Sequence, residues 1–153
     1  MQITREADLA IRCVCLLAHR PGKTASIGEI SMAATASGDR IAKVIQKLAK
    51  AKIIKPSGRA DGIFELAVKP SAISFLDVIE AIDGPAAFGS CGLNNGPCSP
   101  GAPCAIHPLW VDILGQVRKV LANKNFAEFK PGFENAAFAQ QCPLSGDRDY
   151  RVL

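Results

Sequence analysis

The sequence predicts a mainly α-helical fold with a small β-hairpin. Five segments have the hydrophobic spacing of amphipathic helices, and two short β-type segments flank a glycine-containing turn. Aromatic residues make up only 6% of the chain, which suits a helical core of aliphatic side chains. At 153 residues the chain has room for one ordinary domain and an oligomerisation segment.

The first predicted helix covers residues 3–19 and ends before Pro21 and Gly22. One face of this helix carries the residues expected to be buried, Leu9, Cys13, Leu16 and Leu17. His19 stands at the end of the helix, where we expect it to be exposed and to interact with the helix dipole.

A second, short helix is predicted over residues 26–34, because Ser26 and Glu29 have the spacing of a capping box. A third helix is predicted over residues 39–52. Its buried stripe consists of Ile41, Val44, Ile45 and Leu48. The opposite face of this helix is rich in lysine and arginine, so the helix is strongly amphipathic.

Residues 53–57 and 63–68 read as two strands of a basic hairpin. A helix, a short helix, a basic amphipathic helix and then a hairpin is the order of a winged helix-turn-helix. In that fold the third helix enters the major groove of DNA. We therefore predict that residues 1–70 form a winged helix-turn-helix DNA-binding domain.

The charge distribution supports a polyanionic partner for this first half. Residues 1–70 contain twelve Lys and Arg against six Asp and Glu, whereas residues 71–153 contain six against eight. The predicted DNA contacts are Ser37, Arg40, Lys43, Lys47 and, on the wing, Arg59. The alternative is a small helical domain whose lysine-rich face is only solvated.

The second half begins with a predicted helix over residues 73–83 and continues through a loop to a helix over residues 108–123. The apolar stripe of the later helix consists of Trp110, Ile113, Leu114, Val117 and Leu121. A second subunit is the natural partner for that stripe, and a two-fold homodimer suits a pseudo-palindromic DNA site. We divide this half into a connecting helix, loop and dimerisation helix (71–129) and a tail without strong periodicity (130–153).

The loop between these helices, within residues 88–107, concentrates side chains that bind soft metals. Six residues separate Cys91 from Cys98, five separate Cys98 from Cys104, and two separate Cys104 from His107. Thiolates with an imidazole suit zinc, copper(I) or an iron-sulfur cluster. The wide gaps favour a cluster over zinc, whose ligands are usually closer in sequence. A loop that holds no metal is the remaining alternative.

The chain resembles the Rrf-type family of winged-helix transcriptional regulators, which includes iron-sulfur sensors of the IscR, NsrR and RirA types. The resemblance covers residues 1–129. It is carried by the segments MQITREADLAIR, IAKVIQKLAKA and FLDVIEAIDG, by the cysteine loop and by HPLW. Where members of the family often have a glycine after the third helix, this chain has Lys52. We therefore expect that helix end to be shaped differently.

The resemblance implies a homodimer that binds DNA and holds a cluster through Cys91, Cys98, Cys104 and one further ligand. His107 would complete an IscR-like [2Fe-2S] site, whereas Asp8 of the partner subunit would complete an NsrR-like [4Fe-4S] site. We favour His107 and therefore [2Fe-2S], because imidazole is the better iron ligand beside thiolates.

The sequence thus predicts a cytoplasmic, homodimeric transcriptional regulator, expected to be a repressor, that binds double-stranded promoter DNA. An iron-sulfur cluster in the 91–107 loop would sense iron, redox state or nitric oxide. No segment has the length and hydrophobicity of a membrane span, and no arrangement of side chains indicates an enzyme. The alternatives are a zinc-stabilised protein-binding module and a cluster-free regulator that senses through thiols.

Overall fold

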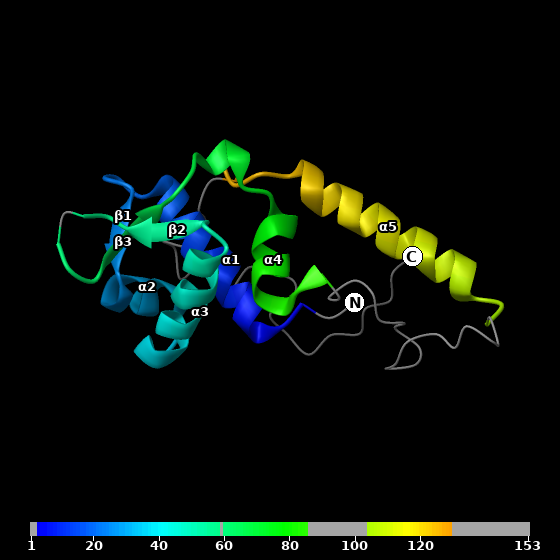
Figure 1. Ribbon diagram of the computed structural model, residues 1–153, viewed down its shortest axis with the longest axis horizontal. Helices are drawn as coiled ribbons and strands as arrows, with labels where there is room; N and C mark the ends of the chain where they lie inside the picture. The colour runs from blue at the N-terminus through cyan, green and yellow to red at the C-terminus, as the bar shows by residue number, and fades with distance from the viewer. Residues whose placement is uncertain (1–2, 59, 86–103, 130–153) are drawn as a thin grey trace.

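The described part of the chain contains five α-helices and a three-stranded sheet (Figure 1). This computed structural model describes residues 3–58, 60–85 and 104–129. The elements in chain order are α1 (Arg5–His19), β1 (Thr24–Ser26), α2 (Ile27–Ala34), α3 (Gly38–Lys50), β2 (Ile54–Pro56), β3 (Ile63–Leu66), the 3-10 helix η1 (Pro70–Ala72), α4 (Phe75–Asp83) and α5 (His107–Asn123). The predicted mainly α-helical fold with a hairpin is confirmed.

Side-chain caps begin three of the helices. The Thr4 hydroxyl accepts a hydrogen bond from the backbone at the start of α1. Complete capping boxes start α2, through Ser26 and Glu29, and α4, through Ser74 and Asp77. In each box the two side chains satisfy backbone N–H groups that have no partner within the helix. The predicted start of the second helix is therefore confirmed.

The core is formed mainly by one face each of α1, α3 and α4. The predicted stripe of α3 is buried, and α1 buries most of its predicted face, with Leu16 only partly covered. The largest fully buried side chains on these three helices are Leu17, Ile41, Leu48, Ile79, Val14, Val44 and Val78. Burial of this one face leaves the basic face of α3 in solvent.

The sheet contains the predicted hairpin and one further strand. Strands β2 and β3 pair antiparallel, with Lys55 opposite Glu65. Strand β1 also pairs antiparallel with β3, so that the strand order is β1-β3-β2. Strand β1 was not predicted from the sequence. Its three residues are too few to show an alternating pattern, and it forms because the edge of β3 is available to it.

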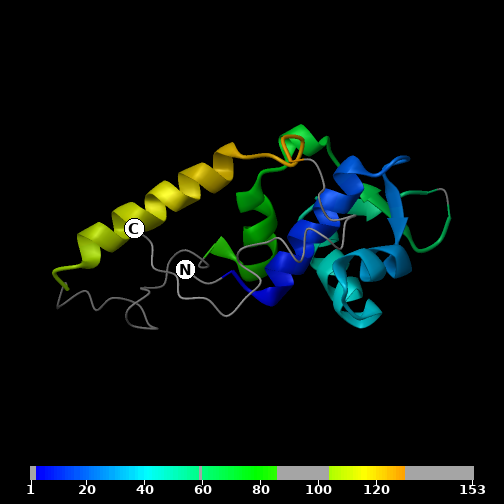
Figure 2. The same cartoon turned by 180° about the vertical axis from the view of Figure 1, so that it is seen from behind.

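Helix α5 extends away from the other helices and strands of the described structure (Figures 1 and 2). None of its 17 residues is fully buried. Val117 and Leu121 pack on Leu76 and Ile79 of α4, and the Glu80 carboxylate pairs with Arg118 at 2.6 Å. Among the described residues, no helix is both long and apolar enough to cross a membrane.

The segment after α5 returns to the core. Phe126 is fully buried, and its ring stacks on Phe75 with the ring centroids 4.3 Å apart. The Phe126 N–H donates to the Ile73 carbonyl oxygen at 3.2 Å, and Ser74 forms a β-bridge with Asn125. The helix is thus fixed at its C-terminal end.

Candidate DNA-binding face and cysteine site

The predicted DNA contacts on α3 share one exposed face. Ser37 is the N-cap residue of α3, and Arg40, Lys43 and Lys47 follow at intervals of three, three and four residues. This spacing aligns them on the helix surface, away from the buried stripe. The structure therefore brings four of the five predicted residues together. We call Arg40, Lys43 and Lys47 the cationic stripe; Arg59 lies outside the described residues.

The turn between α2 and α3 presents the stripe to solvent. Thr35 ends α2 in the left-handed conformation, with φ at 51°, and the Ala36 N–H donates to the Ser31 carbonyl oxygen. The next residue, Ser37, already starts α3. A turn this short holds the two helices at a fixed angle, as in a helix-turn-helix. A β-branched residue is unfavourable in the left-handed region, so the turn is held at some energetic cost.

The C-terminal end of the stripe is occupied by an ion pair. The Nζ atom of Lys47 lies 2.6 Å from Oε2 of Glu6, in the first turn of α1. The hydrogen bond from Lys47 and its charge lower the pKa of Glu6, and the charges of Lys43 and Arg40 add to this effect. Glu6 was not identified from the sequence. An acidic residue in a first turn is common because it interacts favourably with the helix dipole.

A second group of charged residues lies beside Arg40. Arg5, Asp8, Arg12 and Arg40 all line a hollow of about 260 Å³ between α1 and the α2–α3 turn. The Nε atom of Arg12 donates to Oδ2 of Asp8 at 3.0 Å. Asp8, the alternative cluster ligand, therefore shares a hollow with one of the predicted DNA contacts.

The turn of the wing has a glycine at each end. Gly58 and Gly62 have positive φ angles of 69° and 74°, which glycine adopts without strain. Between them lies Arg59, outside the described residues. On the strands, Lys55 pairs with Glu65 at 3.2 Å. The positive charge of Lys55 is thus balanced by Glu65 on the neighbouring strand.

The described part of the cysteine site lies at the start of α5. Cys104 is exposed, and its Sγ accepts a hydrogen bond from the Ile106 N–H at 3.4 Å. The His107 N–H donates to the Cys104 carbonyl oxygen at 3.0 Å. One turn of backbone therefore holds Cys104 and His107 together. Cys91 and Cys98 lie outside the described residues, and residues 3–58, 60–85 and 104–129 alone contain no cluster of three metal-binding side chains.

The two cysteines of α1 belong to the core. Both Cys13 and Cys15 are buried. Burial raises the pKa of the Cys13 thiol to about 12 and that of the Cys15 thiol to about 11. A thiol that stays protonated is a poor nucleophile and a poor metal ligand. These residues act as small apolar side chains.

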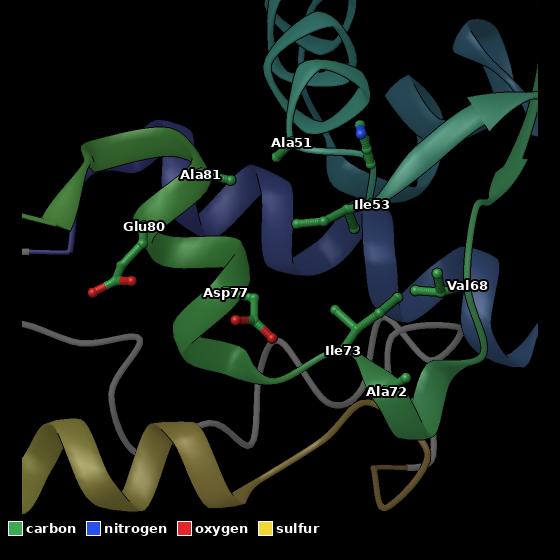
Figure 3. A pocket seen from close by; sticks show the side chains of 9 residues that line it. Ala51, Ile53, Val68, Ala72, Ile73, Asp77, Glu80 and Ala81 are labelled. Carbon is green, nitrogen blue, oxygen red and sulfur yellow. The ribbon is translucent and has the colours of Figure 1, made fainter.

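A pocket of about 340 Å³ lies where α4 meets the end of α3 and the segment around β3 and η1 (Figure 3). Ile53, Val68 and Ile73 form an apolar wall, and two carboxylates extend from α4. The Asp77 carboxylate already caps α4, and Glu80 pairs with Arg118. The two carboxylates of this pocket thus help to hold α4 and α5 in place.

Comparison with a family model decides the classification. The model named Rrf2, described as an iron-dependent transcriptional regulator, matches residues 3–130. The chain belongs to the Rrf2 family. The protein is therefore a transcriptional regulator with a DNA-binding winged helix, and not an enzyme. This confirms the resemblance identified from the sequence.

Individual relatives of this Rrf2 protein agree with the classification. It is 25% identical over 134 residues to the HTH-type transcriptional regulator Rv1287 of Mycobacterium tuberculosis, a match that covers 86% of this chain and 83% of the relative. Among solved structures, oxidised CymR of Staphylococcus aureus gives a TM-score of 0.69 at 23% identity and covers 86% of this chain and 99% of its own.

Two further structures share the fold. CymR (YrzC), the global cysteine regulator of B. subtilis, has a TM-score of 0.70 at 20% identity and covers 86% of this Rrf2 chain and 99% of its own. IscR of T. potens has a TM-score of 0.63 at 18% identity, with coverages of 84% and 85%. These likenesses show the winged-helix fold of the Rrf2 chain.

Proposed function

We propose that this Rrf2 regulator binds promoter DNA as a homodimer and senses iron, redox state or nitric oxide through an iron-sulfur cluster. The observation that carries the DNA-binding half is the exposed cationic stripe on α3, directly after the α2–α3 turn. The sensing half rests on the three loop cysteines and His107. The proposed domains remain those predicted from the sequence: 1–70, 71–129 and 130–153.

The stripe suits entry of α3 into the major groove. Ser37 and Arg40 stand at the start of α3, the end of a recognition helix that usually reaches the bases. Lys43 lies in the middle of α3 and Lys47 in its last turn, where contacts with phosphates of the promoter site are expected, for Lys47 once its ion pair with Glu6 opens. Arg59, on the wing, would add a contact to the backbone or minor groove.

Helix α5 supplies the proposed dimer contact. Ile106, Leu109, Ile113 and Val120 are exposed and lie along one side of α5 or its N-cap. Val117 and Leu121 were predicted from the sequence to contact the second subunit, but they pack on α4 of their own chain, on the neighbouring side of α5. Apolar residues at this spacing over a 17-residue helix fit a second copy of the same helix, packed about a two-fold axis. Such a dimer would place two α3 helices on a pseudo-palindromic site.

The described donors fit a cluster. Cys104 is exposed, and the hydrogen bond that its Sγ accepts from the Ile106 N–H helps to orient the side chain. His107 lies in the same turn, so it would join Cys91, Cys98 and Cys104 as the fourth ligand. When bound there, a cluster supplies reversible one-electron and ligand-exchange chemistry. The chain's own part is to orient Cys104 and His107 at the start of the dimerisation helix.

We favour [2Fe-2S] with His107 over [4Fe-4S] with Asp8 of the partner subunit. The shared turn of Cys104 and His107 supports this choice. Asp8 is paired with Arg12 within its own chain, and a ligand role would require that pair to rearrange or to extend to the cluster. A cluster-free form that senses through its thiols is the second candidate, and exposed Cys104 is the observation that favours it.

Anaerobic purification, followed by the visible spectrum and quantification of iron and acid-labile sulfide per chain, tests the cluster. We expect about two irons per chain, lost in His107→Ala and in Cys104→Ser. They should be retained in Cys142→Ser, which changes a cysteine of the 130–153 tail. About four irons with loss in Asp8→Ala would replace the [2Fe-2S] assignment by [4Fe-4S]. Colourless protein that stays iron-free after reconstitution would contradict the sensing half, and zinc in it would favour the protein-binding module.

Selection of bound sequences from a pool of random duplexes tests the DNA-binding half. We expect a pseudo-palindromic consensus, because each subunit of a two-fold dimer reads one half-site. Comparing cluster-loaded and cluster-free protein on the selected duplex then tests sensing. Equal affinity of both forms would contradict a regulatory role for the cluster.

A further inference from the structure

Glu6 lies in α1, but its carboxylate contacts the cationic stripe of α3 through Lys47. It stands in the first turn of α1, and its Oε2 atom lies 2.6 Å from Nζ of Lys47 on α3. The two side chains are 50% and 45% exposed, so the pair lies at the surface. The ion pair therefore lies on the surface that a DNA phosphate would approach in the proposed complex.

The other cations of the stripe also act on this carboxylate. The charges of Lys43 and Arg40 add to that of Lys47 in lowering the pKa of Glu6. By the same coupling, the negative charge of Glu6 reduces the positive potential that the whole stripe presents. An acidic residue at a helix start is explained by the helix dipole. The helix dipole does not explain why Glu6 contacts Lys47 of a neighbouring helix and also senses the charges of Lys43 and Arg40.

We propose that Glu6 limits the affinity of this regulator for DNA of any sequence, by holding Lys47 in an ion pair and by repelling phosphates near the stripe. The inference rests on the proposed DNA-binding face. Affinity for non-specific DNA is almost wholly electrostatic, whereas base contacts add to specific binding. Glu6 is thus a specificity-determining residue, because it weakens the part of binding that carries no sequence information.

The test uses the full chain, a short fluorescein-labelled duplex of random sequence, and anisotropy titrations at several KCl concentrations. We expect Glu6→Gln to bind this duplex about threefold to tenfold more tightly. Because Lys47 becomes available to one more phosphate, the slope of log affinity against log salt should steepen by about 0.9. Glu6→Asp keeps the charge and should stay close to the original protein.

Two further variants separate the proposed role from a structural one. In a Lys47→Gln background the effect of Glu6→Gln should shrink, because only Lys43 and Arg40 remain to respond. Glu128→Gln removes another exposed Glu–Lys pair, with Lys124 beyond the end of α5, and should leave the affinity and the salt slope unchanged. Thermal melts of each variant verify that it is folded.

The outcomes distinguish this inference from the proposed function. If Glu6→Gln and the original protein bind the duplex with equal affinity and equal salt slope, the role of Glu6 is wrong while DNA binding stands. If neither binds the duplex even at low salt, the DNA-binding face is wrong, and the inference fails with it.

Discussion

The Nε2 atom of His19 lies 2.8 Å from the carbonyl oxygen of Phe126, which is 107 residues later in the chain. His19 ends α1 and is half-buried, whereas the sequence indicated an exposed residue at a helix end. That expectation was wrong because the segment after α5 covers this end of α1. The hydrogen bond and the Phe126 ring together fix the chain after α5 to the core.

Phe126→Ala should lower the free energy of unfolding by about 3–5 kcal/mol, because a fully buried ring is replaced by a cavity. Urea unfolding measures this loss. Phe129→Ala is the matched control, since Phe129 is 42% exposed and should lose less than about 1 kcal/mol. Similar losses for both variants would show that Phe126 is not an anchor.

Lys52→Gly should raise the free energy of unfolding by about 1 kcal/mol. Lys52 has a φ of 59° just after α3, a left-handed conformation that costs a side chain more than it costs glycine. The expected change of shape at this helix end is thus not needed: the lysine takes the conformation typical of a glycine. Gln46→Gly, at an exposed position in the interior of α3, should instead destabilise by about 1 kcal/mol. A thermal or urea melt in which Lys52→Gly is less stable would contradict this account.

The cluster-free protein should lose stability above pH 9. Its buried thiols have folded pKa values of about 12 for Cys13 and about 11 for Cys15, both above the ordinary value of 9.0. Between these values the unfolded chain releases protons that the folded chain keeps. Each thiol therefore contributes stability below pH 9 that is lost as pH rises toward its folded pKa, by about 1.4 kcal/mol per pH unit.

Urea unfolding between pH 8 and pH 10.5 measures this effect. Cys13→Ala should show a shallower decline than the original protein, because one of the two buried thiols is gone. Val14→Ala removes buried volume but no thiol, so it should lower stability without changing the slope of the decline. Identical slopes for all three proteins would contradict the role of burial.

Val120→Glu should convert the proposed dimer to a monomer. Val120 is 60% exposed on the apolar side of α5, and a carboxylate there would be buried without a partner in the dimer. Sedimentation velocity measures the change. Lys119→Glu, on the adjacent polar position, should remain dimeric. A dimeric Val120→Glu protein would place the subunit contact elsewhere.

Lys43→Ala should weaken binding to a random-sequence duplex and reduce the salt slope by about 0.9, as expected for one lost phosphate contact. Anisotropy titrations over a range of KCl concentrations give both quantities. Lys119→Ala removes the same charge from α5 and should leave the slope unchanged. An unchanged slope for Lys43→Ala would remove this residue from the DNA-binding face.

Local patterns were enough to predict most of the fold. The capping box of Ser26 and Glu29 and the buried stripe of α3 depend on residues within one or two turns, and both are confirmed. The five helices are all present for the same reason. Strand β1 was missed because it exists only through its pairing with β3, 39 or so residues away, and a three-residue strand has little pattern of its own.

The candidate site was predictable in part. The exposed positions of Arg40, Lys43 and Lys47 follow from their spacing opposite the apolar stripe of α3. The contact of Glu6 with Lys47 joins residues 41 apart, so periodicity carries no information about it. The cluster ligands remain a prediction, since Cys91 and Cys98 lie outside the described residues.

Because α5 is attached to the core near Phe126, the helix can act as a lever about that point. At 1.5 Å per residue its 17 residues span about 25 Å, so a tilt of about 5° at the Phe126 end would move the His107 end by about 2 Å. Conversely, a small displacement near Cys104 would rotate α5 only slightly where the helix meets the core. Large movements at the cysteine site are thus compatible with an intact winged helix. The stiffness of the attachment at Phe126 determines how much of each movement is transmitted to it.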